Sequence, residues 1–214
     1  MSTMTCKLIC FDLDGVIFKD INFWMELHKK FGTLDEGKIL TEKYLHTDYD
    51  TLVAEVVGKL WKGRDAQLYY ELVASLEYLP GVAKTFAALK KKGVVTAIIS
   101  ASSLDCARRV QSDFGVDHLF ANELVIRDGK ITGEFVWPIG AGKHKKAEIT
   151  RHLREDLGVD KKECVFVGDS ETDIEAFSEV GLSIAFNCLS EKVKLAAQAV
   201  VEGNNLTLIL PLIK

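Results

Sequence analysis

Two carboxylates at the end of an apolar run are the first residues that suggest chemistry. The run at residues 6–11 leads into Asp12-Leu13-Asp14-Gly15, and such a run is typical of a buried central strand of a parallel sheet. Ligands of these sheets bind beyond the carboxyl ends of the strands. Two anions so close repel each other unless a cation lies between them, so the pair indicates a metal site. An Asp-Gly hairpin turn whose acids bond only to local backbone is the alternative.

A group of small hydroxyl side chains follows a second apolar run. Residues 100–103 read Ser-Ala-Ser-Ser, after a predicted strand at 94–99 and at the start of a predicted helix that ends near Phe114. Free backbone N–H groups in the first turn of a helix attract phosphate. The segment is therefore a candidate phosphate-binding loop, and a serine that only caps the helix is the alternative.

Lysines and further acids stand at the next two junctions between elements. Lys143, Lys145 and Lys146 open a predicted helix, where cations are unfavourable unless they face anions. Asp169 and Asp173 follow the next apolar run. A solvated lysine face and helix-capping acids are the alternatives at these two places.

These groups can meet around one ligand, because parallel strands present their carboxyl ends at the same edge of a sheet. Together they suit phosphoryl transfer. A carboxylate attacks phosphorus, a cation cancels the repulsion between them, and serine, lysine and backbone N–H groups hold the phosphoryl oxygens.

The elements predicted around these residues form an α/β fold with a helical insert. Apolar residues at helical spacing predict four helices between residues 19 and 79. Strands and helices alternate afterwards, with a hairpin at 124–136 that turns at Asp128-Gly129. We expect a Rossmann-like parallel sheet flanked by helices, built from residues 1–18 and 80–214, and a helical cap domain at 19–79.

Composition narrows the classes of partner. The 214 residues carry 27 basic and 31 acidic side chains without a long block of one sign, so we expect no nucleic-acid surface. Five cysteines without Cys-x-x-Cys spacing favour reduced thiols and a cytoplasmic location. No apolar run approaches the roughly 18 residues of a membrane span, and the N-terminus shows no targeting pattern, so we expect no membrane association.

Four motifs resemble, in the same order, those of the haloacid dehalogenase-like phosphatases. They are Asp12-Leu13-Asp14-Gly15-Val16, Ser100, Lys146 before Ala147-Glu148-Ile149, and Gly168-Asp169-Ser170-Glu171-Thr172-Asp173. Pro80-Gly81, residues 120–124 and residues 129–133 resemble the phosphoserine phosphatase branch in particular.

The resemblance implies a role for each motif. Asp12 would be the nucleophile and Asp14 the general acid and then base. Mg²⁺ would be held by Asp12, Asp169 and the backbone carbonyl of Asp14. Ser100, Ala101 and Lys146 would hold the phosphoryl group, and Asp173 would orient the lysine. Lys143 and Lys145 are rivals for the role of Lys146.

The resemblance implies a small phosphorylated metabolite as substrate, and we expect phosphoserine as the first candidate and phosphoproteins to be excluded. Phosphoserine phosphatases carry a glutamate soon after the first motif for the amino group, and an arginine in the cap for the carboxylate. Here Asp20 is the nearest acid and Arg64 is the only arginine of the insert. Ala101 and Ser102 stand where glycines are usual, a second departure from the family.

Three other classes share part of this pattern. A signalling module that accepts phosphate on aspartate without turnover needs neither Asp14 nor the insert. A dehalogenase of the same fold does not need Asp14, because its leaving group takes no proton. A phosphomutase differs only in contacts from the cap.

Overall fold

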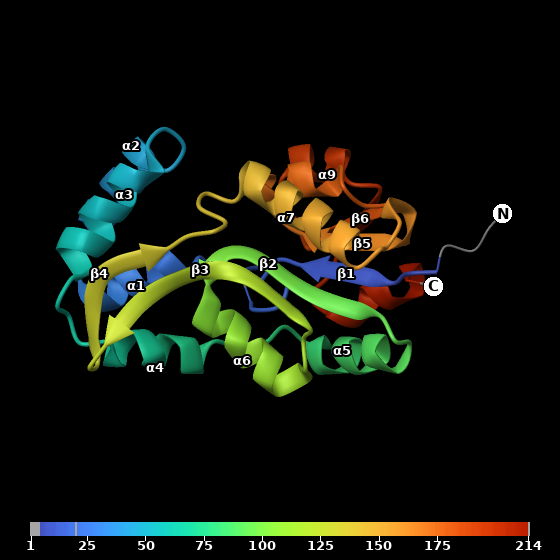
Figure 1. The fold of residues 1–214 in the computed structure, drawn as a ribbon, viewed down its shortest axis with the longest axis horizontal. Coiled ribbons are helices and arrows are strands. Elements are labelled where there is room, and N and C mark those ends of the chain that lie inside the picture. The colour runs from blue at the N-terminus through green and yellow to red at the C-terminus, as the bar shows by residue number, and fades with distance from the viewer. Residues whose placement is uncertain (1–4, 20, 214) are drawn as a thin grey trace.

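A seven-stranded sheet runs through the centre of the molecule (Figure 1). The computed structural model describes residues 5–19 and 21–213. The strand order is β4-β3-β2-β1-β5-β6-β7, and neighbours pair in parallel except β3 and β4. The strands are β1 (Leu8–Phe11), β2 (Val95–Ser103), β3 (His118–Arg127), β4 (Lys130–Val136), β5 (Cys164–Gly168), β6 (Leu182–Phe186) and β7 (Ala199–Val201).

Helices cover both faces of this sheet, as Figure 1 shows for α5 and α6 on one side and α7 and α9 on the other. Successive side chains of β1 alternate between the faces, so Ile9 and Phe11 belong to one core while Leu8 and Cys10 belong to the other. The predicted α/β fold is confirmed. The helices are α5 (Val82–Lys91), α6 (Leu104–Phe114), α7 (Lys143–Asp156), α8 (Ile174–Phe177) and α9 (Glu191–Ala196), with short 3₁₀ turns η2 (Lys161–Glu163), η3 (Glu171–Asp173) and η4 (Leu206–Leu212).

The predicted boundary after β2 is wrong. The strand continues through residues 100–103, because their backbone still pairs with β3 after a register shift. Helix α6 therefore begins at Leu104, and Ser103 is its N-cap, accepting a hydrogen bond from the Asp105 N–H at 3.2 Å. Ser100 thus lies in a strand and does not open a helix.

Residues 23–75 form helices only, as the spacing of their apolar residues predicts. Asn22 caps α1 by accepting a hydrogen bond from Met25 N at 3.2 Å, and Gly32 ends it in the left-handed region. The third predicted helix changes to a π-helix at Val56. The elements are α1 (Phe23–Phe31), α2 (Leu34–Tyr44), α3 (Tyr49–Glu55), η1 (Val56–Trp61) and α4 (Gln67–Ser75).

This helical segment, which we call the cap, is bonded to the β3–β4 hairpin through backbone groups. Gly63 N donates to Ile131 O at 2.8 Å, and Ile131 N donates to Arg64 O at 3.0 Å. Ala66 N donates to Gly129 O at 2.8 Å. The division into a cap domain at 19–79 and a core domain from the rest stays a prediction.

No helix among the described residues is both long and apolar enough to cross a membrane.

A buried histidine inside the cap is expected to make its stability depend on pH. His28 is 2% exposed, its Nδ1 lies 2.8 Å from Thr33 Oγ1, and burial lowers its pKa from 6.5 to about 4. Between pH 6.5 and about 4, His28 is therefore protonated in the unfolded chain and neutral in the folded one. The free energy of unfolding should fall as the pH drops through this range. Urea unfolding at a series of pH values measures this slope.

The variant His28→Gln should flatten the slope in that range. His46→Gln, at an exposed position of the same cap, is the matched control and should keep it. Equal slopes in the two variants would contradict the assignment to His28.

Candidate active site

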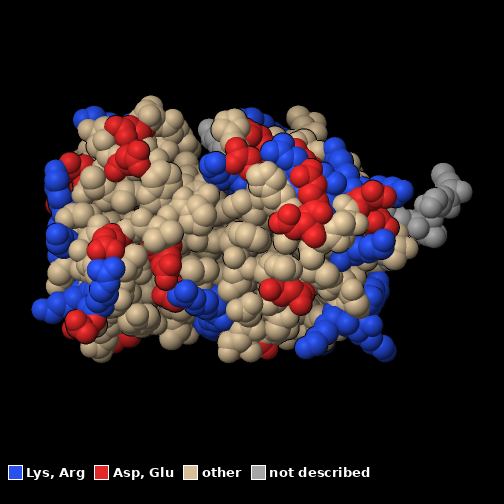
Figure 2. All heavy atoms as spheres, in the orientation of Figure 1, with Lys and Arg blue, Asp and Glu red and all other residues tan. Residues whose placement is uncertain are grey.

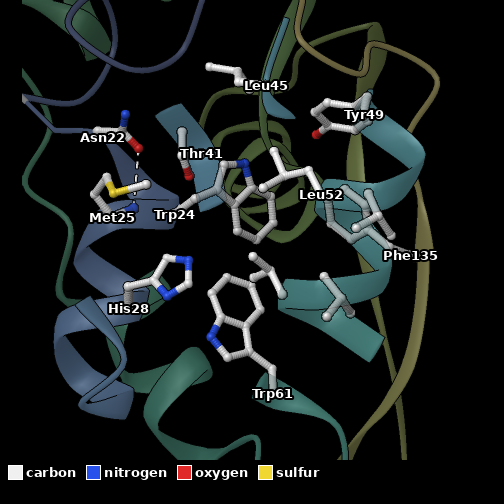
Figure 3. A pocket seen from close by; sticks show the side chains of 13 residues that line it. Asn22, Trp24, Met25, His28, Thr41, Leu45, Tyr49, Leu52, Trp61 and Phe135 are labelled. Carbon is white, nitrogen blue, oxygen red and sulfur yellow. Dashed lines mark hydrogen bonds between the residues drawn. The ribbon is translucent and has the colours of Figure 1, made fainter. Parts of the chain in front are cut away.

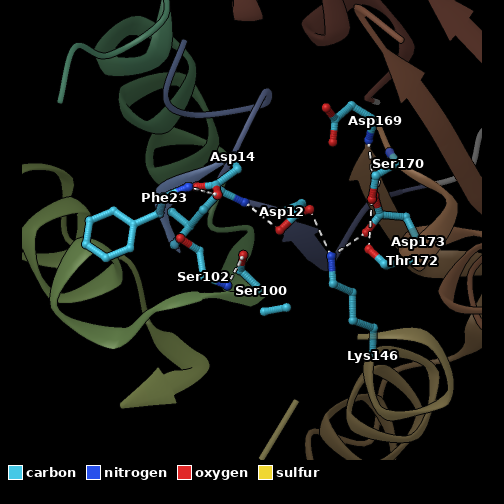
Figure 4. Close-up of polar contacts among 12 residues, drawn as sticks. Asp12, Asp14, Phe23, Ser100, Ser102, Lys146, Asp169, Ser170, Thr172 and Asp173 are labelled. Carbon is cyan, nitrogen blue, oxygen red and sulfur yellow. Dashed lines mark hydrogen bonds and ion pairs between the residues drawn. The ribbon is translucent and has the colours of Figure 1, made fainter. Parts of the chain in front are cut away.

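A buried lysine between two aspartates forms the centre of the candidate site (Figure 4). Asp12 directly follows β1, and its N–H extends the sheet by donating to Val167 O at 3.0 Å. Lys146 comes from the first turn of α7, and its Nζ lies 2.8 Å from Asp12 Oδ2 and 2.7 Å from Asp173 Oδ1. Both Lys146 and Asp173 are 0% exposed. The unfavourable position of a cation at a helix start is thus offset by two anions.

The charges around Lys146 keep it protonated. Burial alone would lower its pKa, but the neighbouring carboxylates of Asp12 and Asp173 outweigh burial and raise it. Because buried ions are stable only when they are paired and hydrogen-bonded, each of the three groups depends on the others.

Asp173 is held in place by a ring of donors. Its Oδ2 accepts hydrogen bonds from Asp169 N at 3.1 Å, from Ser170 N at 3.0 Å and from Ser170 Oγ at 3.0 Å. Its other oxygen is left for Lys146. With both oxygens bonded, Asp173 can fix the position of the lysine but has little capacity for a metal.

Asp12 and Asp169 are the carboxylates best placed to bind a cation. Oxygens of Asp12, Asp169 and Asp173 lie within 4.8 Å of one another. Burial and the charges of Asp12 and Asp173 raise the pKa of Asp169 to about 8. A bound divalent cation would relieve this repulsion, and an all-oxygen donor set fits Mg²⁺, Ca²⁺ or Mn²⁺ better than zinc.

Gly15 provides the space that the Asp169 side chain occupies. Its φ is +78°, and a Cβ at this position would lie 2.1 Å from Asp169 Oδ2. A larger residue would be strained and would push the carboxylate away from Asp12. The first and last motifs are therefore complementary in shape as well as in charge.

Asp14 lies beside the first helix of the cap and is partly buried. Its Oδ2 accepts a hydrogen bond from Phe23 N at 3.1 Å, whereas its buried Oδ1 has no partner among the described residues. Burial, followed by the charge of Asp12, raises its pKa to about 7. Asp14 can therefore carry or release a proton near neutral pH, as a general acid or base requires.

The segment from Ser100 to Ser102 borders the site from β2, the strand beside β1. Ser100 is buried, and its Oγ accepts a hydrogen bond from Ser102 N at 3.2 Å. The Ala101 carbonyl accepts hydrogen bonds from Trp24 Nε1 at 2.9 Å and from Asn122 Nδ2 at 3.0 Å. This segment is thus held by the cap on one side and by β3 on the other.

Sequence reasoning missed the part that Asn122 plays. It is 0% exposed and also bonds Gly140 O at 3.1 Å and Ile139 N at 3.2 Å. It therefore joins the Ser100 segment to the loop that precedes α7. The signal in the sequence is an amide that directly follows the apolar residues Leu119-Phe120-Ala121 of this strand.

Among the three candidate lysines, the structure brings Lys146 to the aspartates. Lys145 is exposed and pairs with Glu148 at 2.6 Å. The side chain of Lys143 lies outside the described part of the chain.

Of the two residues predicted to hold an amino acid, the structure describes Arg64. Arg64 Nε donates to Leu60 O at 2.7 Å, and its Nη1 donates to Phe31 O at 2.6 Å. Two nitrogens of the guanidinium group thus join cap helices, and the contact of Arg64 with a substrate carboxylate stays a prediction. Asp20 lies outside the described residues.

Comparisons with known proteins place this geometry in a family. The profile of the haloacid dehalogenase-like hydrolases matches residues 9–178. The chain is 28% identical to a phosphoserine phosphatase of Methanocaldococcus jannaschii over 97% of this chain and 98% of that protein. It is 30% identical to a phosphoserine phosphatase of Albidiferax ferrireducens over 92% of this chain and 85% of that protein.

A solved structure gives the same result. A phosphoserine phosphatase described as a phospho-aspartyl intermediate analogue superposes with a TM-score of 0.84 at 27% identity, covering 98% of this chain and all of the other. The predicted resemblance and enzyme class, a phosphoric monoester hydrolase, are confirmed. The chain belongs to the haloacid dehalogenase-like hydrolase family, in the branch that resembles phosphoserine phosphatases.

Proposed function

We propose that this enzyme hydrolyses small phosphomonoesters through an aspartyl phosphate on Asp12 and requires a divalent cation, most simply Mg²⁺. The observation that carries the proposal is the buried Asp12–Lys146–Asp173 contact, with Asp14 and Asp169 beside it. A lysine fixed against the attacking carboxylate offsets the charge that a phosphate would bring.

The reaction divides into two displacements. An oxygen of Asp12 bonds to phosphorus while the bond from phosphorus to the leaving oxygen breaks, and protonated Asp14 gives that oxygen its proton. Ionised Asp14 then takes a proton from water, whose oxygen bonds to phosphorus as the Asp12–phosphorus bond breaks. Lys146 and Ser100 would hold phosphoryl oxygens throughout. A cation bound by Asp12 and Asp169 would supply further neutralisation of charge.

Phosphoserine is the first candidate substrate, because the relatives named above carry that activity in their names. The cap limits the size of the ligand, since its first helix contacts both Asp14 and the Ser100 segment.

A reducing, cytoplasmic compartment would suit the five cysteines, which are all free and buried.

The test is turnover of a generic aryl phosphate with Mg²⁺. An enzyme should release many equivalents of phosphate, whereas a signalling module would stop after one stable phosphorylation. Thorough chelation should reduce the rate to background, and added Mg²⁺ should restore it, because Asp12 and Asp169 repel each other and phosphate without a cation. Full activity after chelation would refute the requirement for metal.

Asp14→Asn should separate proton transfer from phosphoryl transfer. Asparagine cannot donate an acidic proton, so kcat/KM for an alkyl phosphate should fall by about 10²–10⁴-fold, a typical contribution of general acid–base catalysis. The loss should be smaller for an aryl phosphate, whose leaving group needs less protonation. Parallel kinetics with both substrates measures the difference, and an equal loss on both would contradict the role of Asp14.

A further inference from the structure

The cap and strand β4 line a partly open apolar cavity of about 110 Å³ (Figure 3). Its walls come from α1, α2, α3, η1 and β4 of the hairpin. Aromatic and aliphatic side chains dominate the lining, among them Trp24, Trp61, Phe135, Leu52, Val53 and Val56. A natural core is normally packed without voids of this size, so the cavity is a candidate binding site.

The lining offers little to a charged ligand. None of the described residues that line it is Asp, Glu, Lys or Arg. His28 is neutral at physiological pH, because burial lowers its pKa to about 4, and its Nδ1 faces Thr33. The Asn22 side-chain oxygen is used to cap α1. An ammonium or carboxylate group placed here would lose its hydration without a charged partner among these residues.

The cavity adjoins the catalytic groups through three consecutive residues. Asn22 and Trp24 line it, and Phe23 between them donates its N–H to Asp14 at 3.1 Å. The Trp24 indole donates to Ala101 O at 2.9 Å. The wall of the cavity at Trp24 therefore contacts the Ser100–Ser102 segment that borders Asp12.

A larger hollow of about 490 Å³ continues the cavity toward the surface. It shares Leu45 and Tyr49 with the cavity and reaches Gly142 and Lys145 at the start of α7. Figure 2 shows the surface notched between the part with α2 and α3 and the part with α7 and α9. The apolar cavity can thus be reached from the surface between cap and core, past Leu45 and Tyr49.

We propose that this cavity binds the organic part of the substrate, and that this part is a small uncharged apolar group, a short branched alkyl chain or a single ring. The inference rests on the proposed hydrolysis of small phosphomonoesters, and it replaces phosphoserine, the first candidate from the names of the relatives, with an apolar substrate class. Apolar cavities of about 150 Å³ stay dry and bind benzene, so 110 Å³ suits a group of that size or slightly smaller.

Four alkyl phosphates test the proposal: ethyl, isopentyl and glycerol phosphates and O-phosphoserine. A hydrophobic pocket discriminates by about 10–200-fold per methylene at most, so kcat/KM for isopentyl phosphate should exceed that for each of the others by at least about 10-fold. A value for O-phosphoserine equal to or above that for isopentyl phosphate would overturn the proposal. So would a selective loss of O-phosphoserine hydrolysis in Asp20→Ala.

Binding decides the matter even without turnover. Trp24 and Trp61 line the cavity, and Trp137 contacts Tyr49 with ring centroids 5.2 Å apart. Tryptophan fluorescence of the Asp12→Asn protein should therefore change on titration with isopentyl phosphate, at a concentration at least about 10-fold below that needed for O-phosphoserine. The reverse order refutes the inference. Failure to hydrolyse even ethyl phosphate would count against the proposed function alone.

Two matched variants locate the effect. Val53 lines the cavity and is half-buried, so Val53→Asp should lower kcat/KM for isopentyl phosphate by at least about 10-fold. Ile39→Asp places the same charge on α2 at a residue that is 65% exposed and should change nothing. If Val53→Asp fails to fold, the nearly isosteric Val53→Thr should give a smaller loss in the same direction. Unchanged kinetics in a folded Val53 variant would refute the proposal.

Discussion

Asp12→Asn is expected to lower kcat on every phosphomonoester by at least about 10⁴-fold, because removal of a catalytic nucleophile costs losses of this order or larger. The amide is nearly isosteric with the carboxylate, and its one oxygen can keep one of the two hydrogen bonds that Asp12 Oδ1 and Oδ2 accept from Leu13 N and Lys146 Nζ, at 2.8 Å each. Lys146 also keeps its contact with Asp173. The fold should therefore survive while the attacking anion is lost.

Acid quenching after brief exposure to ³²P-labelled substrate measures the covalent intermediate. Label should appear on the wild-type protein within the peptide that contains Asp12, and no label should appear on Asp12→Asn. Label on Asp169 would show that the nucleophile is a different carboxylate.

Lys146→Met is expected to affect both stability and rate. Removing one partner of a buried ion pair costs about 3–5 kcal/mol, because the remaining charge is left uncompensated. Here Asp12 and Asp173 would both lose their cation. The loss of an electrostatic contact to the transferring group should in addition lower kcat by about 10²–10³-fold. Denaturant unfolding without added metal, together with steady-state kinetics, measures the two effects.

Lys145→Met is the matched control, one residue away on the same helix. This lysine is exposed and, among the described residues, pairs with Glu148, so the change in unfolding free energy should stay within about 0.5 kcal/mol. A comparable loss in both variants would mean that lysines act through the general charge of the helix start, and not through the buried contact.

The catalytic edge of the sheet is predictable from sequence because it depends on short local patterns. The apolar runs that end at Phe11 and Gly168 are each followed directly by an aspartate. Parallel pairing of the two strands brings these aspartates together. The predicted helix start also places a lysine cluster near these acids, but it does not select Lys146 over Lys143 and Lys145. These features can be predicted from the spacing of apolar residues along the chain and from the parallel direction of the strands.

Other features depend on distant contacts that local patterns do not encode. Ser100 looks like a helix start, but pairing with β3 extends the strand past it. Arg64 is long enough to reach several places, and carbonyls of the folded cap determine where it lies. The apolar cavity is invisible in sequence, because its walls come from segments as far apart as Asn22 and Phe135.

The backbone bonds between the cap and the β3–β4 hairpin have a mechanical consequence. Residues 63–66 are fastened to residues 129–131 by three N–H to carbonyl bonds, and β3 is in turn a strand of the central sheet. The end of the cap near η1 and α4 is therefore fixed to the hairpin, and it cannot move away from the core unless the hairpin moves with it. Any opening that admits substrate would be a bending of α1, α2 and α3 about that end, and the widest displacement would fall at the far loop, residues 45–48.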